Sequence, residues 1–321
     1  MAMHEAGKPQ EPKRTDFLPK GTLSVSQVAT FRACQYKWFL QRVVRQEKDA
    51  DYEEDPSIFA LGKAFHHALE MSNHLPEISG DWFIRENDAG MYGLMRMFGI
   101  GIWDAVKVSS MLKAYRELHE LTGLRVVMNE LKIFRDGFGG YIDAIMVDDL
   151  NFEWWICDMK TSGWVENNLE TRLPLDPQLN AYASMADLVP SLVPGVRGKQ
   201  FAGCLYRVTT KPRHKPSKKK KETFLDAMNR MDPVATEHRI PIERMDPELI
   251  MDGIKTAERN MNSIRNGFMK PDRNVKACTD YNRTCEYWSQ CHGWLASEAK
   301  SAAIINTIDK LKRQEKVKEF L

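Results

Sequence analysis

The chain has 321 residues, with nearly equal numbers of basic and acidic side chains and a net charge of +2. This length can bury a substantial core, in one elaborated domain or in two. A charge so close to zero excludes nucleic-acid binding through overall charge, so any such affinity must come from local clusters. No apolar run approaches the roughly 18 residues that a membrane-spanning helix needs, and we expect no contact with a membrane.

The spacing of apolar residues and the positions of turn residues predict a mixture of helices and strands. In chain order the predicted segments are a flexible tail over 1–20, a helix from Ser24 or Ser26 to about 45, an acidic loop over 47–55, a helix over 56–72, a mostly helical insert over 80–123, strands over 124–134, 140–147 and 152–160, a helix over 176–188, a strand over 200–208, a helix over 247–267 and an amphipathic helix over 296–321. The insert has the spacing of a core helix, and a gate over a substrate channel is the alternative.

Two of the predicted strands carry isolated carboxylates, Asp143 and Asp158. Charged groups that leave water must be paired or bind a metal. A hairpin across the turn at 148–151 would bring both together, and Lys160 shares the strand face of Asp158 because side chains alternate. Two carboxylates and an ammonium are the minimum set for a divalent cation and an activated water. The alternative is a strand edge with solvated charges, against which the aromatic run before Asp158 counts.

Further motifs flank this pair. Gly62 and His66 are four residues apart on a predicted helix, as are Gln178 and Tyr182 on a later one. With Glu130 on the first strand, Gly-x-Ile-Asp and Asp-x-Lys-Thr, the order of motifs resembles the RecB-type branch of the PD-(D/E)XK nuclease superfamily. The resemblance spans residues 23–294. It implies an α/β, restriction-endonuclease-like core, a small mixed central sheet flanked by helices, within a nuclease domain over 21–295.

The resemblance also implies a role for each motif residue. His66, Asp143 and Asp158 would ligate Mg²⁺ or Mn²⁺ together with the Met159 carbonyl. Lys160 would orient and help deprotonate the attacking water, and Gln178 and Tyr182 would hold the scissile strand or the lysine. Glu130 would lie at the rim, towards a second metal. Many relatives have Glu where this chain has Asp158, and both occur in the superfamily. His67 is the rival of His66, and we expect a structural role for it.

Six cysteines fall into two groups. Cys157 and Cys204 lie in apolar runs and are expected to be core thiols. The other four are Cys34, in the first predicted helix, and Cys278, Cys285 and Cys291. Four thiolates suit either a 4Fe–4S cluster or a structural zinc, for which His292 could replace one thiolate.

The resemblance favours iron. AddB and the CRISPR adaptation nucleases use one early and three late cysteines, and Ser24-x-Ser26 before Cys34-x-Tyr36 fits their early helix. The late trio departs from their Cys-x₂-Cys-x₅-Cys pattern, because its first gap here is six residues. A cluster would join the two ends of the chain.

The strongest local charge lies in the segment 211–221. Its basic residues are Lys211, Arg213, Lys215, Lys218, Lys219, Lys220 and Lys221. Two prolines in the same segment predict a mobile loop. Such a loop is either a solvated insertion or a basic finger that contacts DNA phosphates without sequence preference.

Together these features predict a metal-dependent DNA nuclease, most simply an exonuclease acting on single-stranded DNA or DNA ends. No recognition domain is evident that would direct sequence-specific cutting. The resemblance places it in the cytoplasm of a bacterium or a phage-infected cell, with recombination, repair, replication or CRISPR adaptation proteins as partners. The alternative is a non-catalytic DNA-end-binding or assembly factor that retains the fold.

Overall fold

The computed structural model describes residues 22–46, 56–74, 93, 95–164, 166–213, 226, 230–278 and 285–293. They belong to two compact units, one over 55–247 and one formed by 21–54 together with 248–321. The predicted tail at 1–20, the predicted helix at 296–321 and the basic residues from 215 to 221 lie outside the described residues. Within these residues, no helix has the length and apolar character to cross a bilayer.

The first unit is built on a five-stranded mixed sheet of order β1-β2-β3-β4-β5. The strands are β1 (Arg125–Arg135), β2 (Phe138–Asp148), β3 (Glu153–Ser162), β4 (Gln200–Thr210) and β5 (Ala235–Pro241). β3 and β4 are parallel, and the other neighbours are antiparallel. The three-stranded meander and β4 confirm the sequence prediction.

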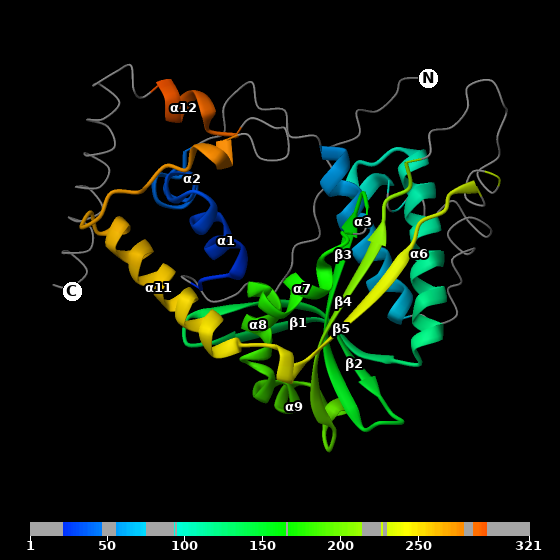
Figure 1. Cartoon of the computed structure of the whole chain (residues 1–321). Helices are drawn as coiled ribbons and strands as arrows, with labels where there is room; N and C mark the ends of the chain where they lie inside the picture. The colour runs from blue at the N-terminus through cyan, green and yellow to red at the C-terminus, as the bar shows by residue number, and fades with distance from the viewer. Residues whose placement is uncertain are drawn as a thin grey trace, which may run out of the picture. The chain divides into compact units, whose positions relative to one another are not determined.

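Helices cover both faces of this sheet (Figure 1). They are α3 (Pro56–His74) and α6 (Ile102–Thr122) on one face, and α7 (Leu169–Arg172), α8 (Pro177–Ala183) and α9 (Val189–Leu192) in the crossover between β3 and β4. Parallel neighbours need such a crossover connection. α3 and α6 bury Phe65, Leu69, Met111 and Leu112 against the sheet. α6 therefore serves packing, while the predicted gate role and the insert boundaries at 80–123 stay predictions.

The second unit contains α1 (Val25–Ala33), α2 (Gln35–Phe39), a π-helical turn (Leu40–Val44), α11 (Pro247–Arg265) and α12 (Trp288–Gly293). Ser24 caps α1 by accepting a hydrogen bond from Gln27 N. The prediction of one continuous helix to about 45 is wrong at Cys34, whose backbone is extended. The Cys34 sulfur instead accepts the N–H of Lys37 and caps α2.

The strand β5 was not predicted from the sequence, because its alternating charges give no apolar strand signal. One of those charges is buried by pairing. Glu237 of β5 lies opposite Arg207 of β4, and both side chains are almost inaccessible to solvent. Charges inside a sheet are tolerated when each finds a partner of opposite sign.

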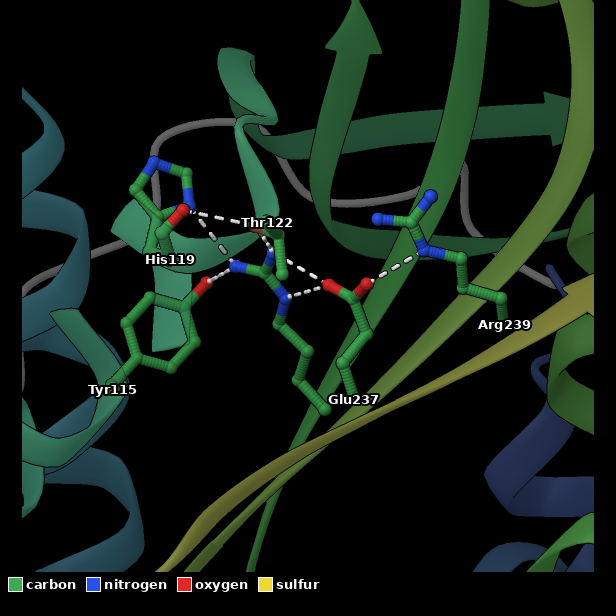
Figure 2. A network of polar contacts seen from close by, with 6 residues as sticks. Tyr115, His119, Thr122, Glu237 and Arg239 are labelled. Atoms are coloured by element: carbon green, nitrogen blue, oxygen red, sulfur yellow. Dashed lines mark hydrogen bonds and ion pairs between the residues drawn. The ribbon is translucent and has the colours of Figure 1, made fainter. Parts of the chain in front are cut away.

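Arg207 is the centre of a buried polar network that joins the sheet to α6 (Figure 2). Its guanidinium donates to Glu237 Oε2 from Nε at 2.8 Å and from Nη2 at 2.6 Å. It also donates to the Tyr115 hydroxyl at 2.9 Å and to Thr122 Oγ1 at 3.0 Å, and its Nη1 lies 3.1 Å from His119 Nδ1. A guanidinium only donates, so His119 must accept through Nδ1 in its neutral form. Burial and the neighbouring Arg207 both lower the pKa of His119, which agrees with a neutral imidazole at this position.

The network predicts a large loss of stability when its anion is removed. Glu237→Gln leaves the Arg207 charge buried without a counter-ion, so the free energy of unfolding should fall by about 3–5 kcal/mol. The matched control is Asp149→Asn, which removes a carboxylate that is 53 % exposed and pairs with Arg125 and Lys199. Because the carboxylate stands in solvent, this change should have little effect. Urea denaturation of both variants measures the difference. Equal stability of the two variants would show that the network contributes nothing.

Candidate metal and catalytic site

The site is created where β2 and β3 part. The two strands pair from Asp148–Glu153 to Ala144–Cys157, and no pair follows. The hairpin turn is held by Asp148, whose Oδ1 accepts the N–H groups of Leu150 and Asn151. The predicted hairpin is thus present, but Asp143 and Asp158 lie just beyond its last pair.

Asp143 bridges the parted strands. Its Oδ2 accepts the Met159 N–H at 2.7 Å, in place of a ladder bond. Its Oδ1 lies 3.9 Å from His66 Nδ1 on α3. The carboxylate is thereby fixed by a main-chain donor of β3, and its other oxygen faces an imidazole of α3.

Asp158 and Lys160 form the second half of the site. Lys160 Nζ donates to Asp158 Oδ1 at 2.8 Å and to Gln178 Oε1 of α8 at 3.3 Å. Burial raises the pKa of Asp158 to about 6 against the opposing effect of the Lys160 ammonium, and the Asp143 carboxylate adds to the rise. Burial acts to lower the pKa of Lys160, but the carboxylates of Asp158 and Asp143 outweigh it and raise that pKa. Lys160 is therefore an ammonium at neutral pH.

Helix α3 is brought against this site by a glycine. A Cβ on Gly62 would lie 3.1 Å from Thr161 Oγ1, so a larger side chain would push the helix away from β3. One turn later, His66 reaches Asp143. Glu70 of the same helix lies 3.8 Å from the rival His67. His67 also lies against the Phe98 ring, which agrees with a structural role.

Tyr182 of α8 contacts Gln178, the residue that holds Lys160. Its hydroxyl donates to the Tyr141 carbonyl of β2 at 2.9 Å. A Cβ on Gly140 would lie 2.5 Å from that hydroxyl, so the glycine makes room for it. Gln178 contacts Lys160, whereas Tyr182 holds the backbone of the strand that carries Asp143.

Glu130 stands across from Asp143, between the paired residues Asn129–Ala144 and Leu131–Ile142. Its φ is 50°, a left-handed conformation that is unusual for a strand residue other than glycine. Such strain is concentrated at functional sites. The predicted role of Glu130 towards a second metal stays a prediction.

Two residues near the site were missed in the sequence. Tyr206 is the β4 partner of Asp158, and its phenol is close enough to Lys160 to affect the pKa of that lysine. Asp176 caps α8 through the N–H groups of Gln178 and Leu179 and adds negative charge near Asp158. The Asp-Pro-Gln sequence is a helix-start signal that could have identified Asp176.

The donor types fit a hard divalent cation, although a complete cage is not formed. Within the described ranges, no group of three or more His, Cys, Asp or Glu side chains is arranged to hold a metal ion. Asp143 and His66 do stand together, and burial together with the nearby Asp143 carboxylate raises the pKa of Asp158 although the Lys160 ammonium lies beside it. The predicted Met159 carbonyl ligand stays a prediction.

The other four cysteines lie together in the second unit, while Cys157 and Cys204 are fully buried core thiols, as predicted. Cys285 N donates to the Cys278 carbonyl at 2.8 Å. Burial raises the pKa of the Cys291 thiol, and Cys278, Cys34 and Cys285 lie close enough to raise it further.

Polar contacts hold the Cys34 segment to the late cysteine segment. Asn274 Nδ2 donates to the Ala33 carbonyl at 2.8 Å, and Lys37 pairs with Glu286 at 3.3 Å. The Arg273 guanidinium lies over the Tyr36 ring. These contacts join the two segments that carry the four cysteines, whose thiols, among the described residues, are near one another but not arranged to hold a metal ion.

Of the basic segment 211–221, the structure describes the first three residues. Lys211 N donates to the Ser162 carbonyl, and Arg213 Nη2 donates to the Gly163 carbonyl at 3.3 Å. Both contacts join the end of β4 to the end of β3. Lys211 and Arg213 thus stand at the same end of the sheet as Lys160.

Comparison with known proteins gives one family. A family model described as PD-(D/E)XK nuclease superfamily matches residues 22–292, which include every motif residue described above. No curated protein matches the chain.

The raised pKa of Asp158 predicts a pH-dependent stability of the metal-free protein. Its pKa of about 6 in the folded chain exceeds the value of about 3.9 of an unfolded aspartate. Its contribution to stability is therefore fully present below about pH 4 and is lost as the pH rises through about 6. The stability of Asp158→Asn relative to wild type should thus increase from pH 4 to pH 8, by up to about 3 kcal/mol at about 1.4 kcal/mol for each pKa unit.

Urea denaturation in the presence of a chelator measures this difference at each pH. Asp149→Asn is the control, because it removes an exposed carboxylate of the same type. A constant difference between Asp158→Asn and wild type across this pH range would contradict the prediction.

Proposed function

The chain belongs to the PD-(D/E)XK nuclease superfamily, and we propose that it is a metal-dependent exonuclease that hydrolyses phosphodiesters of single-stranded DNA or of DNA ends. The observation that carries the proposal is the arrangement at the parted strands. There, His66 lies against Asp143, and Lys160 bridges Asp158 and Gln178.

Asp143, Asp158 and His66 would hold Mg²⁺ or Mn²⁺, and the imidazole favours Mn²⁺ over Ca²⁺. The cation would stabilise charge on the phosphate oxygens and lower the pKa of a bound water. The chain supplies the geometry. Asp143 is fixed by Met159 N–H, so one of its oxygens stays directed towards His66.

Lys160 acts in this proposal mainly by position. Its raised pKa keeps the ammonium protonated in the metal-free protein, so it donates hydrogen bonds to the attacking water or to a phosphate oxygen. Gln178 and Asp158 hold Nζ from two sides. Tyr182 acts on the site through the β2 backbone that carries Asp143. Glu130, on β1, would lie at the rim of the site, towards a second metal.

The exonuclease assignment and the cellular context rest on the resemblance. Iron–sulfur relatives of the RecB type act mostly on ends and single strands. The context would be recombination, repair, replication or spacer processing, with proteins of those processes as partners. The non-catalytic alternative gains no support from the site, because a binding factor has no chemical need for Lys160 held between Asp158 and Gln178.

We also propose that Cys34, Cys278, Cys285 and Cys291 hold a 4Fe–4S cluster. The grouping of the four thiols supports it, as does the Lys37 N–H donated to the Cys34 sulfur. Hydrogen bonds to cluster sulfurs are one means by which proteins tune such centres. A structural zinc bound by the same thiolates is the alternative.

The basic segment 211–221 is proposed to contact DNA phosphates. Its first residues emerge at the end of β4, where Arg213 contacts Gly163 just beyond the catalytic strand. This position supports a phosphate contact near the cut. A contact of this kind adds affinity without sequence preference.

Cleavage assays test the catalytic assignment. With Mn²⁺ or Mg²⁺, Asp158→Asn and Asp143→Asn should each lower the rate of single-strand cleavage about a thousandfold, because several kcal/mol of charge stabilisation are lost at 1.36 kcal/mol per tenfold. Lys160→Met should lower it about 10²–10⁴-fold while metal affinity persists.

The control is Asp149→Asn, an exposed carboxylate at the far end of the β2–β3 hairpin. It should cleave like the wild type. Undiminished cleavage by Asp158→Asn would falsify the nuclease assignment, and a wild type that binds DNA ends without cutting them would favour the alternative.

Absorption spectra test the cluster. Anaerobically purified protein should be brown, with a broad band near ~400 nm that is typical of thiolate-bound iron–sulfur centres. Cys34→Ser should lose the band and the iron, whereas Cys204→Ala, a change at a core thiol, should keep both. Colourless protein that contains one tightly bound zinc would overturn the iron assignment in favour of zinc.

A further inference from the structure

A cavity at the carboxyl ends of β3 and β4 has a cationic lining. Its volume is about 300 Å³, and Lys211, Arg213 and Arg230 line it together with a single carboxylate, Asp232. Gly163, the residue after β3, forms part of its wall. Burial lowers the pKa of Lys211, because its ammonium has lost part of its hydration. A cavity with this lining fits an anionic group such as a phosphate.

An exposed aromatic side chain follows this wall. Trp164 is 61 % exposed and follows Gly163, two residues beyond the end of β3. Its backbone N–H donates to Ser162 Oγ at 3.3 Å, which holds the main chain at that point. A single exposed apolar residue needs no explanation. An indole next to a cationic cavity, however, is the combination with which proteins bind single-stranded nucleic acid.

The cavity lies close to the catalytic lysine along one strand. Gly163 is three residues beyond Lys160, a distance of about 10 Å at a rise of about 3.3 Å per residue. Both stand at the carboxyl end of the parallel pair β3–β4. Open α/β sheets bind ligands at this end of their strands. A strand of DNA cut at Lys160 would therefore pass the cavity within one or two nucleotides.

We propose that the cavity and Trp164 form a nucleotide subsite for single-stranded DNA. One backbone phosphate near the cut enters the cavity, and the base attached to it stacks on the indole. The inference rests on the proposed nuclease function and defines its substrate class. A base in a duplex is already stacked on its neighbours and is available to Trp164 only after it has been extruded. The subsite therefore selects single strands over duplexes.

Binding measurements without metal test the stacking contact. Fluorescence anisotropy of a short labelled single strand should show affinity lower by about tenfold or more for Trp164→Ala, and recovery of most of it for Trp164→Phe. Binding of the matching duplex should change little. Phe152→Ala is the control, since its ring is 67 % exposed at the opposite end of β3. Single-strand binding that is unchanged in Trp164→Ala, or lost equally for the duplex, would overturn the proposal.

Gly163 allows a test of the phosphate contact without disturbing the fold. An added Cβ there meets no atom within 4 Å. Gly163→Asp places a carboxylate in the cavity and should weaken single-strand binding and reduce the log–log salt slope by about 0.7 unit, the value for one phosphate contact on a single strand. Gly163→Asn, of equal size without charge, should retain wild-type binding. Equal behaviour of the two variants would show that no phosphate enters the cavity.

These tests separate the subsite from the catalytic assignment. If the wild type cleaves single strands, and Trp164→Ala and Gly163→Asp both bind them as the wild type does, the nuclease function is supported and the subsite is contradicted. If the wild type binds single strands but cleaves no DNA, and both variants bind single strands more weakly, the subsite is supported and the nuclease function is not. A wild type that does not bind single strands would also contradict the subsite.

Discussion

The hydrogen bond from Met159 N to Asp143 Oδ2 is the interaction on which the site depends. The β2–β3 ladder ends at Ala144–Cys157, and beyond it a strand N–H would lack a partner. The Asp143 carboxylate takes that N–H at 2.7 Å. One side chain thus satisfies the backbone of the neighbouring strand and directs its other oxygen towards His66. The parting of the strands gives the site its room, and this bond gives it a fixed carboxylate.

Buried charges are fully paired on one face of the sheet and unbalanced on the other. On the α6 face, the Arg207 guanidinium finds a partner at each of its nitrogens, so the network is satisfied and stabilises the packing of helix on sheet. On the α8 face, two carboxylates share one ammonium, and burial raises the pKa of Asp158 to about 6. A strongly perturbed group with an unbalanced charge is typical of functional sites. The same sheet therefore holds one network for stability and another for chemistry.

The parallel pair β3–β4 decides where the functional groups gather. Lys160, Gly163 and Lys211 all belong to the carboxyl ends of these two strands, although they come from separate stretches of the chain. The second unit follows a similar logic. Its early helices and its late cysteine segment are distant in sequence, and contacts of Asn274, Lys37 and Arg273 join them.

The sequence by itself determined the local features: the meander, β4, the helices around His66 and Gln178, the Ser24 cap and the core thiols. These follow from periodicity, capping and residue type, which act over a few neighbouring positions. Tertiary structure alone decided the break at Cys34, the strand β5 with its buried Glu237, the contact of Tyr182 with Tyr141, and the places of Tyr206 and Trp164. Each of these depends on a partner far away in the chain, such as Arg207 for Glu237. A buried charge or an extended cysteine is stable only when that partner is present, and local sequence carries no record of which distant residue will supply it.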